Sequence, residues 1–129
     1  MAADIFGAMA HQALTEPAFF ILAALLDEPR HGYGIVGEVA ELSSGRVRLK
    51  VGTLYGVLDR LVADRLIELD REEITQGRLR RYFRLTDDGV DALVAETERQ
   101  AANVQAASER LRVRRPASGG RPASAGGLA

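Results

Sequence analysis

The stretch "LKVGTLYGVLDRLVADRLIEL", residues 49–69, contains the change from a helical to a strand pattern on which the fold depends. At about 100° per residue, its apolar residues share one side of a helix and its small and polar residues share the other. The apolar side comprises Val51, Leu54, Leu58, Leu61 and Val62, and the outer side comprises Gly52, Thr53, Gly56, Asp59, Arg60 and Ala63. A solvent-facing helix usually carries long charged side chains, so an outer face made mostly of small residues indicates that this face contacts something other than solvent.

Upstream of this stretch the pattern predicts two more helices. Thr15 is suited to cap the first, Pro17 fits its first turn, and the apolar run Ala18–Leu26 predicts a helix in the middle of a core. The second runs from Gly32 to Leu42, with an apolar stripe formed by Ile35, Val36, Val39 and Leu42. The preceding residues 4–14 show only a loosely helical spacing.

Downstream, the period changes to two between residues 67 and 85. Apolar and polar residues alternate on both sides of Thr75-Gln76-Gly77, which predicts a two-stranded hairpin with its turn at these residues. A hairpin alone is marginally stable in water. We therefore expect it to pack on the helices through Ile67, Leu69, Phe83 and Leu85.

The last predicted element is a long helix over residues 87–113. Thr86, Asp87 and Asp88 suit its start, because a hydroxyl can cap the helix and carboxylates favour its positive end. Residues at alternating spacings of four and three follow, a heptad rhythm that predicts pairing with another helix: Val90, Val94, Thr97, Ala101, Val104, Ser108 and Leu111. From residue 114 the chain is rich in Pro, Ala, Ser and Gly, which predicts a disordered tail over 114–129.

Composition excludes several classes of protein. With 129 residues and no cysteine, the chain is expected to form one small domain without disulfides or thiolate zinc sites. Its longest apolar run has nine residues, and no Lys or Arg precedes Arg30, so neither a membrane span nor a secretory signal is expected and the cytoplasm is the expected location. No catalytic constellation or glycine-rich phosphate loop is present, so we expect neither an enzyme nor a cofactor.

Three helices followed by a hairpin, with a very short connection from the third helix to the first strand, is the order of a winged helix-turn-helix. The overall class is therefore mainly α with a small β-hairpin. In this class the third helix enters the major groove of DNA and the hairpin, or wing, reaches the backbone or the minor groove. A helix lying against base edges needs its backbone close to them, which explains the bare outer face of residues 52–63.

Three motifs resemble the PadR family of bacterial transcriptional regulators: "HGYGIVGEVAELSSG" (31–45), "VGTLYGVLDRLVADRLIE" (51–68) and "RRYFRLTDDGVDAL" (80–93). The resemblance covers residues 15 to about 112. It implies a homodimeric winged-helix repressor with a C-terminal dimerisation helix, relieved by a small molecule such as a phenolic acid or a drug-like cation. It places the recognition residues at 52–55, the opening of the second helix at 31–33 and the wing at 77–82.

The expected organisation is a DNA-binding domain over residues 1–86, a dimerisation helix over 87–113 and the tail. The candidate DNA-binding residues are Tyr33, Lys50, Gly52, Thr53, Tyr55, Gly56, Arg60, Arg78, Arg80 and Arg81. The candidate dimerisation residues are Val90, Val94, Thr97, Ala101, Val104 and Leu111, and the candidate effector-pocket residues are Phe6, Met9, Phe19 and Phe20. The expected partners are double-stranded DNA with an inverted repeat, a second copy of the chain and a small aromatic effector.

The chain departs from the family pattern at a few positions. Val51 and Gly56 stand where proline is common, Leu79 occupies a wing position that is often basic, and Asp59 lies on the outer face, where a cation would suit DNA better.

Other interpretations of the same residues are open. Small residues on the outer face also permit close packing of another helix. Arg80 and Arg84 have cross-strand carboxylates within reach, at Glu68, Asp70 and Glu72, which leaves Arg78 and Arg81 as the better phosphate ligands. For His31, a hydrogen bond at the helix start is favoured over a metal site or a pH sensor. Two alternative functions are a winged-helix adaptor that binds a protein and a ligand-binding dimer with a secondary role in DNA binding.

Overall fold

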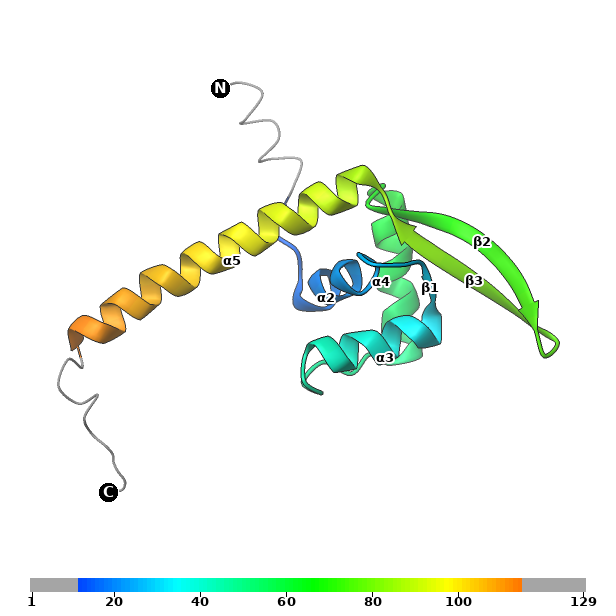
Figure 1. The fold of residues 1–129 in the computed structure, drawn as a ribbon, viewed down its shortest axis with the longest axis horizontal. Coiled ribbons are helices and arrows are strands. Elements are labelled where there is room, and N and C mark those ends of the chain that lie inside the picture. The colour runs from blue at the N-terminus through cyan, green and yellow to red at the C-terminus, as the bar shows by residue number, and fades with distance from the viewer. Residues whose placement is uncertain (1–11, 115–129) are drawn as a thin grey trace, which may run out of the picture. The chain divides into compact units, whose positions relative to one another are not determined.

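The computed structural model describes residues 12–114 and divides after Glu96 into two compact units. Figure 1 shows their elements, with the hairpin extending from the helices in the first unit. The elements are α2 (Glu16–Ala24), β1 (Arg30–His31), α3 (Gly32–Leu42), α4 (Val51–Ala63), β2 (Ile67–Thr75), β3 (Arg78–Leu85) and α5 (Asp87–Arg114). The predicted N-terminal segment up to residue 11, with Phe6 and Met9, and the predicted tail from residue 115 lie outside the described residues.

The first two helices begin where the sequence predicts. The hydroxyl of Thr15 accepts a hydrogen bond from the Ala18 amide at 3.3 Å, and Pro17 lies in the first turn of α2. This helix ends at Ala24, before the predicted Leu26, whose side chain is exposed rather than part of the core. Helix α3 has the predicted bounds.

Helix α4 presents a narrower apolar stripe to the core than its sequence predicts. Leu54, Leu58 and Leu61 are buried. Val51 and Val62 were expected on the same side, but both are exposed. They lie at one edge of the stripe, and the neighbouring elements cover only its centre.

The sheet has three strands in the order β1-β3-β2, not the predicted two. Arg30 and His31 of β1 pair with Phe83 and Tyr82 of β3. A two-residue strand has no periodic pattern, so the sequence did not indicate it. The predicted hairpin is confirmed, with Thr75 opposite Arg78. Its two-residue loop, Gln76-Gly77, has positive φ at both positions, as type I′ hairpin turns require.

Three of the four residues expected to anchor the hairpin do so. Ile67 and Phe83 are buried, and Leu85 is partly buried against the core. Leu69 is exposed, because β2 is an edge strand and a bulge follows directly, between Leu69 and Arg71.

The start of α5 lies against the turn between α4 and β2. The Thr86 hydroxyl donates to the Arg65 carbonyl at 2.7 Å and accepts from the Gly89 amide at 3.0 Å. Gly89 approaches this turn so closely that a β-carbon on it would collide with the Leu66 carbonyl. The absence of a side chain at Gly89 therefore permits this close approach.

In the second unit, the described residues are 97–114 and all of them belong to α5. Every one of their side chains is exposed or nearly so, including the apolar side chains of Val104, Leu111 and Val113. The helix continues to Arg114, one residue beyond the expected boundary of the tail.

Candidate nucleic-acid interface

The outer face of α4 is open to solvent. Gly52, Thr53, Gly56, Asp59, Arg60 and Ala63 are all exposed. A β-carbon built on Gly52 or Gly56 would meet no other atom within 4 Å. Among the described residues, therefore, no helix packs on this face, and its backbone is accessible where the residues are small, at Gly52, Thr53, Gly56 and Ala63.

An open groove runs along one flank of this face. It has a volume of about 840 Å³ and brings three candidate DNA-binding residues, Thr53, Gly56 and Arg60, opposite the segment that leads into α2. The other lining residues are Gln12, Ala13, Leu14, Thr15, Ala18, Val57, Leu61, Asp64, Leu66 and Ala92. On the wall of this groove, Arg60 lies 3.6 Å from the carboxylate of Asp64.

On the opposite flank, Tyr55 lies over the start of α3. A β-carbon on Gly32 would come within 2.7 Å of the Tyr55 hydroxyl oxygen, so glycine at position 32 leaves room for that ring. Tyr55 and Tyr33 are both exposed, as is Lys50, which precedes α4 without a side-chain capping bond. Three candidate residues, one on α3, one on α4 and one just before α4, are thus open to solvent.

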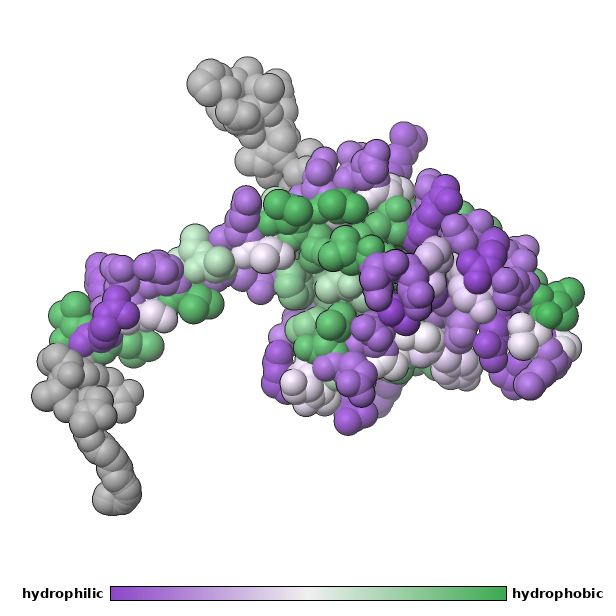
Figure 2. Space-filling model, in the orientation of Figure 1, coloured by the Kyte–Doolittle hydropathy of each residue, from purple (hydrophilic) through white to green (hydrophobic). Residues whose placement is uncertain are grey.

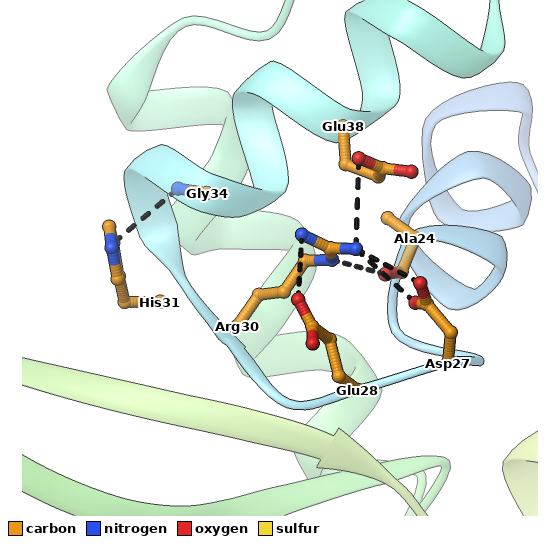
Figure 3. A network of polar contacts seen from close by, with 7 residues as sticks. All are labelled: Ala24, Asp27, Glu28, Arg30, His31, Gly34 and Glu38. Carbon is orange, nitrogen blue, oxygen red and sulfur yellow. Dashed lines mark hydrogen bonds and ion pairs between the residues drawn. The ribbon is translucent and has the colours of Figure 1, made fainter.

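The corner between α2 and α3 is held by Arg30, as Figure 3 shows. Its guanidinium donates to the Ala24 carbonyl at 2.8 Å and pairs with Asp27 at 3.2 Å, with Glu28 at 3.4 Å and with Glu38 at 3.7 Å. Sequence reasoning missed this network, although two acidic residues shortly before Arg30 are a usable signal. The network fixes the segment from which His31 extends toward the wing.

His31 caps α3, as predicted, and also lies against the wing. Its Nδ1 is 3.4 Å from the Gly34 amide nitrogen, its Nε2 is 3.2 Å from an Arg80 nitrogen, and its ring meets the Tyr82 ring edge-on. The pKa of His31 is lowered, first because burial disfavours the charged ring and then because Arg80 is positive, although Glu73 opposes the shift. A neutral imidazole has one acceptor nitrogen, so His31 cannot accept both hydrogen bonds at once.

Several of the wing arginines are engaged in ion pairs along the hairpin. Arg84 lies 2.8 Å from Glu68 and 3.2 Å from Asp70, which matches the predicted cross-strand pairing. Glu72 pairs with Arg81 at 3.3 Å, rather than with Arg80 or Arg84. Arg71, which the sequence did not single out, bonds Glu73 at 2.7 Å and Asp70 at 2.9 Å, and stacks over Tyr82 at 3.9 Å.

Arg78 differs from these arginines. It is exposed beside the turn, and within residues 12–114 no carboxylate pairs with it. It is therefore the cation at the wing tip whose charge is least compensated by the protein.

The remaining candidates fall into two groups. Of the dimerisation residues, Val90 is half-buried, whereas Val94, Thr97, Ala101, Val104 and Leu111 are exposed. Of the effector-pocket residues, Phe19 and Phe20 are half-buried against the core and contact each other edge to face, with ring centres 5.2 Å apart. Neither phenylalanine lines the groove beside α4.

A bare-faced third helix followed by a hairpin with exposed arginines defines a class: the winged helix-turn-helix proteins that bind DNA. The sequence model described as "Transcriptional regulator PadR-like family" matches residues 21–95, so the chain belongs to the PadR-like family. It is a DNA-binding transcriptional regulator, and its family is one of regulators, not enzymes.

Several relatives are similar to the chain. An uncharacterised protein X from Lysinibacillus sphaericus is 32% identical over 85 residues, which cover 66% of this chain and 77% of that protein. An uncharacterised 37.1 kDa protein in transposon TN4556 of Streptomyces fradiae is 40% identical over 81 residues, or 63% of this chain and 22% of that protein. The chain thus matches only about a fifth of the length of that second relative.

The fold is similar to solved structures as well. A PadR-like transcription factor from Bacteroides fragilis is 30% identical, with a TM-score of 0.59, and the match covers 73% of this chain and 87% of that one. A PadR family transcription regulator from Clostridium difficile is 25% identical, with a TM-score of 0.61 and coverage of 75% and 99%.

No helix within residues 12–114 is both long and apolar enough to cross a bilayer.

Proposed function

We propose that the chain is a homodimeric repressor that binds an inverted-repeat operator through α4 and the wing and is released by a small aromatic molecule. The observation that carries this proposal is the open outer face of α4, where no described atom apart from the local helix itself lies within 4 Å of the β-carbon positions of Gly52 and Gly56. Base edges can therefore approach the helix backbone without any rearrangement of the described residues. Thr53 offers a hydroxyl and a methyl group to them, and Tyr55 and Lys50 lie where phosphates would pass.

The exposed part of α5 supports a second copy as the partner. Residues 97–114 bury no side chain within the described protein, although Val104 and Leu111 are apolar and exposed. Most helix stability in proteins comes from packing of an apolar face, so this stretch would be stabilised by a partner. A homodimer supplies an identical seam and places two recognition helices at half-sites about 34 Å apart.

The groove beside α4 supports release by a small molecule. Its volume of about 840 Å³ is in the range of sites for drug-sized ligands. A compound bound there would contact Thr53, Gly56 and Arg60, and would compete with DNA for them. We therefore propose this groove as a further candidate effector site, and the pocket expected at Phe6, Met9, Phe19 and Phe20 stays a prediction.

Selection of bound fragments from random DNA tests the proposal. The full chain should enrich an inverted repeat, and Thr53→Ala or Tyr55→Ala should weaken binding to it about five- to tenfold, as loss of one base or phosphate contact typically does. Leu26→Gln is the control, because Leu26 is an exposed residue just after α2 and is not among the candidate interface residues. If both variants bind like the wild type while circular dichroism shows intact folding, the assignment of α4 is wrong. Enrichment of no sequence would instead favour a protein-binding adaptor.

Release is tested separately. A panel of planar aromatic compounds is screened for a rise in melting temperature, because a ligand that prefers the folded state must stabilise it. Compounds that raise the melting temperature should also displace the operator. A compound that binds without displacing DNA would exclude competition in the groove.

A further inference from the structure

Two large aliphatic side chains are exposed together at the end of the wing. Ile74 and Leu79 are directly opposite each other in the β2–β3 register, and they are 77% and 57% exposed. Figure 2 shows hydrophobic side chains gathered at this end of the hairpin, beyond its mostly polar stem. A cross-strand apolar pair stabilises a hairpin by at most about 1 kcal/mol. This stabilisation alone does not explain why two large apolar side chains are exposed to water.

Residues 12–114 offer this pair nothing to pack on. Strand β1 covers β3 only at Tyr82 and Phe83, so the register pairs from Glu72–Arg81 to Thr75–Arg78 form a free two-stranded ribbon. Four pairs at about 3.3 Å each extend this ribbon by roughly 13 Å beyond the three-stranded part. The pair is therefore held away from the core, at a distance from which it can reach another molecule.

Charge indicates which kind of molecule that is. Within residues 74–79 the one charged side chain is that of Arg78, whereas Arg80 and Arg81 lie directly opposite Glu73 and Glu72 in the register. Arg78 stands directly beside the apolar pair in sequence and has no acidic partner among the described residues. An apolar tip accompanied by an uncompensated cation suits a polyanion that also presents uncharged edges, as the base edges in a DNA groove do.

We propose that Ile74 and Leu79 contact the floor of the DNA minor groove beside the site of α4, and that they select base pairs without the guanine 2-amino group. This inference rests on the proposed operator binding. The minor groove is about 6 Å wide, so the end of the ribbon enters it and the whole ribbon does not. Apolar side chains there would bury the guanine amino donor without an acceptor, which is costly. The acceptors of A·T pairs, in contrast, can bond the Arg78 guanidinium.

The test uses the inverted repeat selected with the full chain, with the base pairs that flank each half-site made A·T, G·C or inosine·C. Inosine·C presents the major-groove edge of G·C but lacks the 2-amino group. The wild type should bind the A·T and inosine·C duplexes alike and the G·C duplex about fivefold more weakly, the lower end of the usual cost of one wrong base pair. Inosine·C that behaves like G·C would overturn the inference without any mutation.

Variants then assign the selectivity to the pair. Ile74→Thr combined with Leu79→Gln should reduce the preference to less than twofold and leave the salt dependence unchanged, because no charge is altered. Ile74→Val combined with Leu79→Met keeps the apolar surface and should keep the preference. Leu26→Gln, at an exposed leucine just after α2, is the matched control and should also keep it.

The outcomes separate this inference from the proposed function. If the Thr/Gln variant retains the preference, or if the Val/Met variant loses it, the apolar pair does not read the groove, although operator binding stands. If the wild type enriches no DNA sequence, both the inference and the proposed function fail.

Discussion

At the scale of the residue, two single positions carry constraints that the sequence pattern does not reveal. Gly89 looks like an ordinary weak position in a helix, yet it allows α5 to approach the Leu66 carbonyl. Gly32 similarly makes room for the Tyr55 hydroxyl. In each case the constraint comes from a residue distant in sequence, so neither composition nor periodicity can predict it.

Gly89→Ala is expected to destabilise the protein by about 1–3 kcal/mol, the usual cost of forcing extra atoms into a packed site. Helix propensity alone predicts the opposite sign, because Ala is better than Gly in a helix by about 0.5–1 kcal/mol. Gly37→Ala is the matched control and should be stabilising by that amount, since nothing lies within 4 Å of its β-carbon position. Urea denaturation measures both; if the two substitutions have equal effects, the contact with Leu66 is absent.

His31 predicts a pH dependence of stability. Its pKa in the folded protein lies below the ordinary value of about 6.5, so the unfolded chain binds the proton more tightly. Its contribution is complete above pH 6.5 and is lost as the pH falls from there toward the folded-state pKa. The free energy of unfolding should therefore fall less between pH 7.5 and pH 5.5 in His31→Asn, which retains a capping acceptor that does not titrate.

The measurement is made in a His11→Asn background, where His31 is the remaining imidazole of the chain. Parallel pH profiles with and without His31→Asn would show that His31 does not titrate differently on folding.

At the scale of the element, the sequence predicts most of the fold. Helices α2, α3 and α4, both hairpin strands and the start of α5 each carry a period, a cap or a turn signal of their own. Strand β1 could not be predicted, because two residues have no periodicity and its pairing with Tyr82 is set by tertiary contacts. The exposure of Val51 and Val62 could not be predicted for a related reason. Periodicity shows which side of α4 is apolar, but not how much of that side the neighbouring elements cover.

For the candidate interface, the sequence identified the face of α4 and the basic wing but not the pairing of individual arginines. Because β2 is acidic and β3 is basic, the sequence predicts that ion pairs form between the two strands, and Arg84 does pair with Glu68 and Asp70. Which carboxylate each arginine takes depends on the register and on the bulge after Leu69. The engagement of Arg81 by Glu72 could therefore be known only from the structure.

This pairing predicts unequal roles for the wing arginines. Arg78→Ala should lower the slope of log affinity against log salt by about 0.9, the value of one phosphate contact. Arg81→Ala should change it less, because its guanidinium is held by Glu72, and Arg84→Ala is the control with two acidic neighbours. The slopes come from operator titrations between 50 and 200 mM salt. Equal slopes for all three variants would mean that ion pairing in the free protein does not decide phosphate contact.

At the scale of the whole molecule, the proposed dimer is the step that turns a single winged helix into a reader of inverted repeats. Val104→Glu should weaken dimerisation at least about tenfold, because it places a charge in the proposed seam, where two copies would bring like charges together. Operator affinity should fall with it, since each monomer then binds one half-site alone. Light scattering coupled to size exclusion measures the mass.

Ala106→Glu is the control for this experiment. Ala106 lies on the same exposed part of α5, about 180° around the helix from the seam, so the added charge should leave the dimer intact. If both variants remain dimeric, the seam is elsewhere.

The two-residue strand β1 connects the wing directly to the corner between α2 and α3. The Arg30 backbone pairs with Phe83, while its side chain is anchored to the end of α2, to the following turn and to α3. Any duplex that bends the hairpin must therefore also strain the anchors of Arg30. A stiff operator would then cost energy twice, once in bending the DNA and once in straining these anchors. Operators that bend easily would therefore be favoured, even at base pairs that no side chain touches.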